Sequence, residues 1–199
     1  MNRSTVLISL VALVFLTVGG CLMNPVREPS SPDSAFVYGR IDLSGAKDQL
    51  NWVSMLTHPR DPNKKKRLNY GGITDVMVHV HSDGTFFAEN VDPGQYYLLY
   101  VDGKVNGFTR TKNIYYLQDM STGKVENPDV FTVHAGEFVY LGAWGYKSEK
   151  KGGGFFGTKD TEFSFNPLED VSEADVLQTI LPLVKGTAWQ EKIQRRLGK

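Results

Sequence analysis

Residues 74–101 read TDVMVHVHSDGTFFAENVDPGQYYLLYV, and this stretch decides the fold. It holds three short runs that are rich in β-branched and aromatic residues, a composition typical of strands. The triplets SDG at residues 82–84 and DPG at residues 92–94 separate the runs. Glycine supplies the positive φ that a tight turn needs, and in the second triplet proline fits the first corner. Both triplets therefore predict turns between neighbouring strands.

The first run also has a clear face. Alternation over residues 74–81 places Val76, Val78 and Val80 on one side of the predicted strand. His79 and His81 then lie together on the other side.

Similar runs extend outward in both directions from this stretch. Residues 36–43 alternate so that Val37, Ile41 and Leu43 share one face. Further strands are expected at residues 51–57, 114–117, 130–133, 138–144 and 162–165. Many short strands with glycine-bearing turns predict a mainly β domain, an antiparallel β-sandwich, over residues 35–168.

The C-terminal residues are expected to form helices that cover one sheet of this domain. Two of the expected strands, residues 95–101 and 138–144, are apolar on both faces, although one face of a sandwich strand normally meets water. Residues 169–199 predict a pair of short amphipathic helices, the first beginning at Ser172 with a capping-box spacing and ending near Pro182. We expect both helices to pack on one sheet. Binding of a partner or of a membrane surface is the alternative.

Three motifs occur in a fixed order along the chain: VYGRI at residues 37–41, DGTF at residues 83–86 and VDPGQYYL at residues 91–98. Together they resemble the transthyretin-like, carboxypeptidase-regulatory-like β-sandwich. The resemblance covers about a third of the chain, residues 36–101, and implies that fold with a binding or structural role. It supplies no catalytic residues. The insertion at residues 57–72 and the helical tail depart from the family's pattern.

The N-terminal residues have the three parts of a secretory signal. Arg3 gives a positive start, residues 6–18 are almost wholly apolar, and two glycines precede Cys21, the only cysteine of the 199 residues. The apolar run is shorter than the ~20 residues of a membrane-spanning helix. Residues 1–20 are therefore predicted to be a signal peptide. An uncleaved anchor helix, or a signal with a cysteine near its exit by chance, is the alternative.

Residues 18–21, VGGC, resemble the lipobox of bacterial lipoproteins. The resemblance implies that Cys21 is the first mature residue and carries acyl chains, palmitate among them, on its sulfur and its amino group. Residues 21–34 would then be a lipidated tether, whose prolines predict an extended segment that reaches about 40 Å. Leu22, rather than aspartate, follows the cysteine, which implies the outer membrane facing the periplasm if the source is Gram-negative.

The charge balance excludes one class of partner. The chain has 22 basic and 22 acidic side chains, and removal of residues 1–20 takes away only Arg3. A nucleic-acid partner calls for a strongly basic face, so none is expected. With a single cysteine, the domain must take its stability from its core rather than from disulfides.

Two groups of residues are candidates for a binding site. His79 and His81 form a workable pair of metal ligands, which Asp83 and His134 could complete if the sheet brings them near. Two solvated histidines on a strand are the alternative.

The second candidate is a glycine-rich loop around Phe155 and Phe156, with lysines nearby. A loop with an apolar tip flanked by lysines is suited to bind a partner or a membrane. A hairpin whose phenylalanines fold back onto the sheet is the alternative.

No short catalytic motif is found in the chain, and no cofactor is expected. Tyr96, Tyr100, Tyr140 and Trp144 could stack on a sugar only if their face were open. The sequence therefore predicts a lipid-anchored cell-envelope protein with a non-catalytic interaction or accessory role. Its expected partners are the membrane, through the acyl chains on Cys21, and an unidentified envelope protein. The alternative is an envelope domain that binds a small ligand, a glycan or a metal; an envelope hydrolase with an unrecognised site has the least support.

Overall fold

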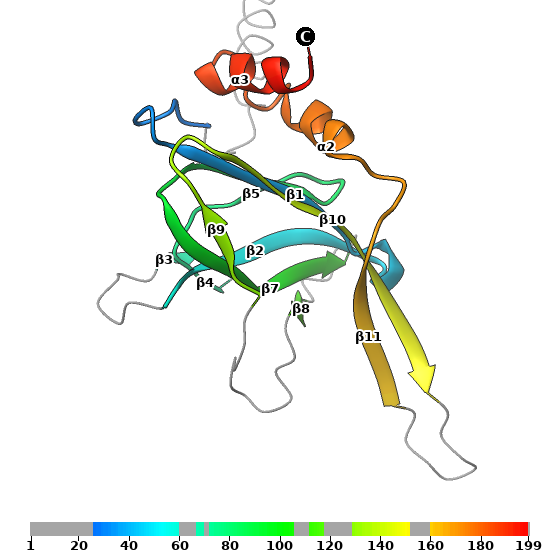
Figure 1. Ribbon diagram of the computed structural model, residues 1–199. Coiled ribbons are helices and arrows are strands. Elements are labelled where there is room, and N and C mark those ends of the chain that lie inside the picture. Colours follow the sequence, from blue (N-terminus) through cyan, green and yellow to red (C-terminus); the bar gives the residue numbers. More distant parts are fainter. Residues whose placement is uncertain are drawn as a thin grey trace, which may run out of the picture.

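The domain is built in three layers, with two short helices above two β-sheets (Figure 1). The computed structural model describes residues 26–59, 67–69, 72–105, 112–117, 129–151 and 160–198. Within these ranges the chain is mainly β, as the sequence predicted. Cys21, Phe155 and Phe156 lie outside the described residues.

The upper sheet has five strands and the lower sheet has four in the described part of the chain. The order in the upper sheet is β11 (Asp160–Pro167), β10 (Phe138–Lys151), β1 (Ala35–Asp42), β6 (Thr85–Val91) and β5 (His79–Val80). The lower sheet holds β2 (Asp48–His58), β7 (Gly94–Val105) and β8 (Lys112–Tyr116), and β9 (Phe131–Val133) also pairs with β7. A short 3-10 turn η1 (Ser44–Ala46) joins β1 to β2, and β3 (Arg67–Asn69) pairs separately with β4 (Gly72–Thr74).

The two sheets share one hydrophobic core. Val37, Ile41 and Leu43 are buried in it together, which confirms the face predicted for the first strand. The buried members of this first core are Ala35, Val37, Ile41, Leu43, Leu50, Val53, Met55, Val78, Phe86, Ala88, Val91, Tyr96, Val101 and Val133. Because they come from both sheets, this core holds the sheets face to face.

One strand pair differs from the antiparallel arrangement that the sequence predicted. β1 runs antiparallel to β6 but parallel to β10, with Phe36 opposite Phe138. After β6 the chain crosses to the lower sheet for β7, β8 and β9, and it then returns beside the start of β1. Parallel neighbours need such a long crossover, and here the lower sheet provides it.

The strand predicted over residues 74–81 is also shorter than expected, because β5 holds only His79 and Val80. Side chains interrupt the ladder before it. Thr74 Oγ1 accepts a hydrogen bond from the amide of Met55, and Asp75 Oδ2 accepts one from the amide of Thr57. Such side-chain bonds replace the partners that a regular strand would supply.

The turn predicted at residues 82–84 is present. Gly84 has a φ of +90°, and its amide donates to the carbonyl of His81 at 3.0 Å. A Cβ at this position would lie 2.3 Å from the carbonyl oxygen of Ile41. Glycine is therefore required here both for its backbone conformation and for the close approach of β1.

The two C-terminal helices are α2 (Glu173–Ile180) and α3 (Ala188–Arg196). The predicted capping box at Ser172 is confirmed: its hydroxyl accepts from the amide of Asp175, and the Asp175 carboxylate accepts from the Ser172 amide at 2.9 Å. This pairing satisfies amides that the first helical turn leaves without partners.

The helices cover the outer face of the five-stranded sheet and form a second hydrophobic core with it. The members of this second core are Phe36, Tyr38, Phe87, Val176, Leu177, Ile180, Val184, Trp189 and Ile193. Phe138 and Tyr140 of β10 pack against it, so the cover predicted for residues 138–144 is found over these two residues, whereas Trp144 is exposed. Residues 95–101 belong to β7 in the other sheet, which these helices do not cover.

A polar contact joins the helices to the centre of the sheet. The Tyr38 hydroxyl donates to Glu173 Oε1, which also accepts from Arg196 Nε at 2.6 Å. Burial, together with the Glu173 carboxylate, raises the pKa of Tyr38, so its hydroxyl stays a donor at any ordinary pH. One carboxylate thus connects β1, α2 and α3.

We expect Trp189→Ala to lower the free energy of unfolding by about 3–5 kcal/mol, because it empties a large buried site. The Trp189 ring is fully buried, and its centroid lies 5.0 Å from that of Phe36. Urea unfolding of the full-length chain, followed by circular dichroism, measures the loss. Trp144→Ala is the matched control, since the Trp144 side chain is exposed and the expected loss is only about 1 kcal/mol. Equal losses in the two variants would contradict the packing of α3 on the sheet.

Candidate functional site

Residues 26–34 lie on the domain, where an extended tether was predicted. The Trp189 indole Nε1 donates to the carbonyl of Arg27 at 2.9 Å, and the amide of Ala188 donates to Glu28 Oε2 at 2.8 Å. Glu28 thereby caps α3, for which the Thr187 side chain makes no cap bond. The predicted reach of about 40 Å therefore does not apply to this part of the segment.

The same segment is bonded to the C-terminal end of β6. The amide of Ser30 donates to Asn90 Oδ1 at 2.6 Å, and Asn90 Nδ2 donates to the carbonyl of Glu28 at 2.9 Å. Asn90 has a φ of +56°, a conformation that asparagine tolerates better than most residues. The Asn90 side chain therefore acts both as an acceptor and as a donor toward the segment.

Beneath the segment lies a buried carboxylate, Glu89. Its Oε2 is 2.8 Å from His79 Nε2, and its Oε1 accepts a long hydrogen bond, 3.5 Å, from the amide of Arg27. The side chains of Glu89 and His79 are 1% and 8% exposed, and the His79 ring stacks on Phe87 with centroids 4.8 Å apart. Burial alone would raise the pKa of Glu89, but the hydrogen bond and charge of His79 and the backbone amides lower it below its usual range.

The second histidine belongs to a different group. His81 Nδ1 lies 2.9 Å from Asp83 Oδ1, which also accepts from the amide of Thr85 at 2.9 Å. Arg40 Nη1 is 3.8 Å from Asp83 Oδ2. Burial raises the pKa of Asp83 less than these hydrogen bonds and the Arg40 charge lower it, so the carboxyl ionises below its ordinary range.

The structure therefore gives each histidine of the predicted metal pair its own carboxylate partner. His134 is exposed in the turn before β10, where its amide donates to Glu137 Oε2 at 2.8 Å. Within the described ranges, no group of three histidine, cysteine or acidic side chains is placed to hold a metal ion. A zinc site normally takes at least three protein ligands, so His79 and His81 remain a predicted pair without a described third.

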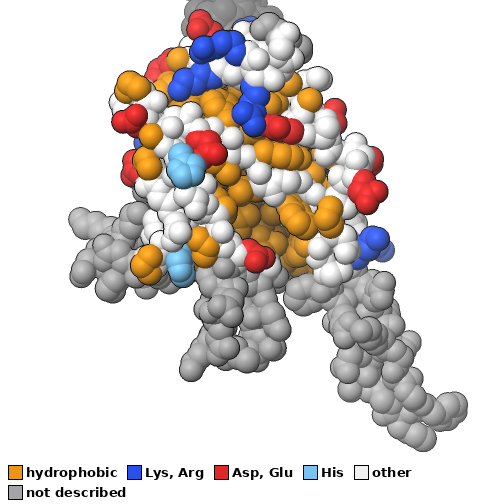
Figure 2. Space-filling view, in the orientation of Figure 1, with side chains coloured by type: hydrophobic (Ala, Val, Ile, Leu, Met, Phe, Trp, Pro, Cys, Tyr) orange, Lys and Arg blue, Asp and Glu red, His pale blue; other side chains and the backbone are white. Residues whose placement is uncertain are grey.

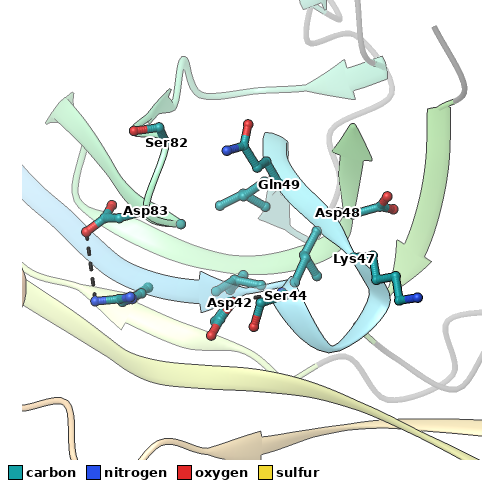
Figure 3. Close-up of a pocket in the computed structure, with 12 residues that line it drawn as sticks. Asp42, Ser44, Lys47, Asp48, Gln49, Ser82 and Asp83 are labelled. Atoms are coloured by element: carbon teal, nitrogen blue, oxygen red, sulfur yellow. Dashed lines mark hydrogen bonds and ion pairs between the residues drawn. The ribbon is translucent and has the colours of Figure 1, made fainter. Parts of the chain in front are cut away.

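A polar pocket of about 440 Å³ lies where β1 ends and β2 begins (Figure 3). Arg40 and Lys47 line it together with Asp42 and Asp83. Asp48 also borders it, but its carboxylate accepts from Asn113 Nδ2 at 2.7 Å and from a tyrosine hydroxyl of β8, so it serves to join β2 to β8. Charges of both signs suit a small polar molecule, although ligand pockets are usually more apolar.

The aromatic residues considered as a sugar platform are separated in the structure. Tyr96 is buried between the two sheets, whereas Tyr140 packs under the helices and Trp144 is exposed. Tyr96, Tyr140 and Trp144 therefore share no open face, and core packing accounts for Tyr96 and Tyr140. Cys21, Phe155 and Phe156 remain predictions, since they lie outside the described residues.

Sequence reasoning missed the residues that bond the layers to one another. Glu28 and Glu89 contact groups far away in the chain; the hydrogen bond from Arg27 to Glu89, for example, spans 62 positions. The one available signal was an acidic residue next to the apolar run at residues 86–88 of β6, where an unpaired carboxylate would be costly to bury.

No helix in the described ranges is both long and apolar enough to cross a membrane.

No family model and no curated protein matches the chain. Among solved structures, a match is a candidate cell adhesion protein from Bacteroides fragilis, with 10% identity and a TM-score of 0.25. The match covers 71% of this chain and 47% of that one, so it spans about half of that protein. At this TM-score the likeness supports no inference about function.

We expect Glu89→Gln to lower the free energy of unfolding by about 1–3 kcal/mol at neutral pH, because it removes a buried charge-assisted contact. The lowered pKa of Glu89 means that the native carboxylate stabilises the fold above its unfolded pKa of about 4.3. This contribution is lost as the pH falls through the lower folded pKa. The difference between native chain and variant should therefore shrink from pH 6 towards pH 3.

Urea unfolding at several pH values measures this difference. Glu191→Gln is the control, since Glu191 is an exposed acid of α3 and its removal should change little at any pH. A Glu89→Gln deficit that stays constant down to pH 3 would contradict the ionised, buried state of Glu89.

Proposed function

We propose that this protein is a lipid-anchored cell-envelope protein with a non-catalytic interaction or accessory role. The observation that carries the proposal is Cys21, which follows an apolar segment and two glycines and is the only cysteine of the chain. Its lipobox-like setting supplies an anchor. Two or more acyl chains on one residue are enough for stable membrane attachment.

Three of the described carboxylates support a non-catalytic role, because each one holds parts of the fold together. Glu89 bonds the N-terminal segment to the sheet, Glu173 joins the helices to β1, and Asp48 joins β2 to β8. A catalytic group needs its reactive atoms directed at a substrate. These carboxylates direct theirs at protein groups.

A partly open apolar region supports an interaction role. Hydrophobic side chains pack against the first core without being fully buried, and Figure 2 shows hydrophobic side chains at the surface between the two sheets. Members from β7, β9 and β10 include Leu98, Phe131, Val139 and Leu141. Contiguous apolar surface on a folded domain is typical of sites where proteins meet.

The finer fold assignment is part of this proposal. The motifs in residues 36–101 resemble the transthyretin-like β-sandwich, and two sheets around one core are compatible with that family. Domains of this kind serve as binding or structural modules. The outer membrane, facing the periplasm, is the proposed location in a Gram-negative source.

We expect Cys21→Ser to release the protein from the membrane fraction and to abolish its labelling by radioactive palmitate. Crosslinking of intact envelopes, followed by mass spectrometry, should recover a defined envelope protein with the native chain and much less of it with the variant. Lys104→Ala, an exposed change in β7, is the control for unaltered fold and attachment. Palmitate incorporation into Cys21→Ser, or membrane attachment equal to that of the native chain, would refute the anchor. An acylated chain with no specific crosslinks would refute the interaction role alone.

Small-ligand binding is the second candidate, and the polar pocket between β1 and β2 favours it. We expect Arg40→Gln to weaken binding of any sugar or anionic ligand found in a screen of the folded protein by about 10-fold, equivalent to one charge-assisted contact. Isothermal titration measures the effect, with Lys192→Gln on α3 as a control outside the pocket. A ligand that binds both variants equally would place its site elsewhere.

A further inference from the structure

The described chain begins on the helical layer of the domain, and this limits how the anchor can be placed. Val26 packs against the second core, and the next two residues bond to Trp189 and Ala188 of α3. Four residues separate Val26 from Cys21. Because an extended chain spans at most ~3.6 Å per residue, Cys21 lies within roughly 18 Å of Val26.

The surface around this starting point is basic. We call residues 26–28 and 185–198 the α3 face. Its basic residues are Arg27, Lys185, Lys192, Arg195 and Arg196, and its acidic residues are Glu28 and Glu191. Figure 2 shows lysine and arginine side chains gathered over the helical layer.

Several of these charges point away from the domain core. Arg27 is 62% exposed and Arg196 is 43% exposed at the side chain, and Arg195 is exposed. Arg27 Nε lies 3.6 Å from Glu89 Oε1, and Arg196 is paired with Glu173 of α2. Lys185, Lys192 and Arg195 then outnumber Glu28 and Glu191, which leaves a small positive excess on the face. This positive excess lies on the helical layer, the same side of the domain on which Val26 begins the described chain.

We propose that the α3 face lies against anionic lipid headgroups, and this inference rests on the proposed lipid anchor. The short connection keeps the face near the bilayer, and basic residues close to a membrane are attracted to its anionic lipids over about one Debye length, ~8 Å at physiological salt. The four-stranded sheet is then the layer farthest from the membrane, and the partly open apolar region lies to its side.

Energy transfer from single dyes to the bilayer tests this orientation. The mature acylated chain is labelled at a cysteine introduced by Gln194→Cys on α3 or by Asn51→Cys on β2. It is then reconstituted on phosphatidylcholine vesicles with or without phosphatidylglycerol. Acceptor dye sits on the lipid headgroups. The dye on residue 194 should transfer more strongly than the dye on residue 51, and phosphatidylglycerol should widen the difference. Equal transfer from both positions on vesicle-bound protein would overturn the orientation.

A charge exchange tests the role of the basic residues. The double variant Lys192→Glu/Arg195→Glu should reduce transfer from residue 194 on phosphatidylglycerol vesicles to the level seen on neutral vesicles. Lys47→Glu/Lys104→Glu makes the same change in net charge on exposed residues of the two-sheet body and should leave that transfer unchanged. Unchanged transfer in the α3 variant would overturn the electrostatic contact. Circular dichroism verifies the fold of each variant.

The same materials separate this inference from the anchor on which it rests. An acylated Cys21 has no free thiol, so the native chain should take up no maleimide dye. Dye uptake at Cys21, or failure of the native chain to float with vesicles, would refute the anchor itself. Flotation without any difference between the two dye positions would refute only the orientation.

Discussion

Burial of β1 on both faces is the constraint on which the rest of the structure depends. Val37 and Ile41 point into the core between the sheets, whereas Phe36 and Tyr38 point into the core under the helices. A strand that is apolar on both sides cannot stand at the surface of a two-layer domain. It requires a third layer, and α2 and α3 provide that layer. The position of β1 between β6 and β10 follows from the same requirement, because both neighbours also contribute side chains to the second core.

Three carboxylates join the helices and the N-terminal segment to the five-stranded sheet. Of these only Glu89 is buried, and a buried charge is stable only with its partners in place. Glu89 bonds to groups of β5 and of the N-terminal segment, Glu28 caps α3, and Glu173 bonds to both Tyr38 and Arg196. Each of these residues belongs to one element and satisfies a group in another. They therefore define where the helices and the first residues of the domain sit on the sheet.

Local features of the fold could be predicted from sequence, and non-local pairings could not. The Gly84 turn and the Ser172 capping box depend only on residues within a few positions, so both can be predicted from the local sequence. The parallel direction of β1 and β10 depends on the path taken by some hundred intervening residues, which no short pattern encodes. His79 and His81 show both cases for the candidate site: Asp83, which binds His81, is only two positions away in the adjoining turn, whereas Glu89, which binds His79, lies on the neighbouring strand β6. Proline and serine content predicted a tether over residues 21–34, yet Arg27 and Glu28 dock on the domain through backbone and carboxylate groups that composition does not reveal.

The central place of β1 has a consequence for the kinetics of folding. Its antiparallel partner is available early in the chain, but its parallel partner begins at Phe138, and the helices that cover Phe36 and Tyr38 come later still. A chain that has emerged only as far as β9 therefore leaves an apolar strand edge and an aromatic patch exposed to its surroundings. Contacts of such long sequence separation slow folding and prolong exposure of these surfaces. The last third of the chain therefore completes the environment of β1, one of the first strands to be synthesised. Until that part has been made, this protein is most prone to aggregate or to bind a chaperone.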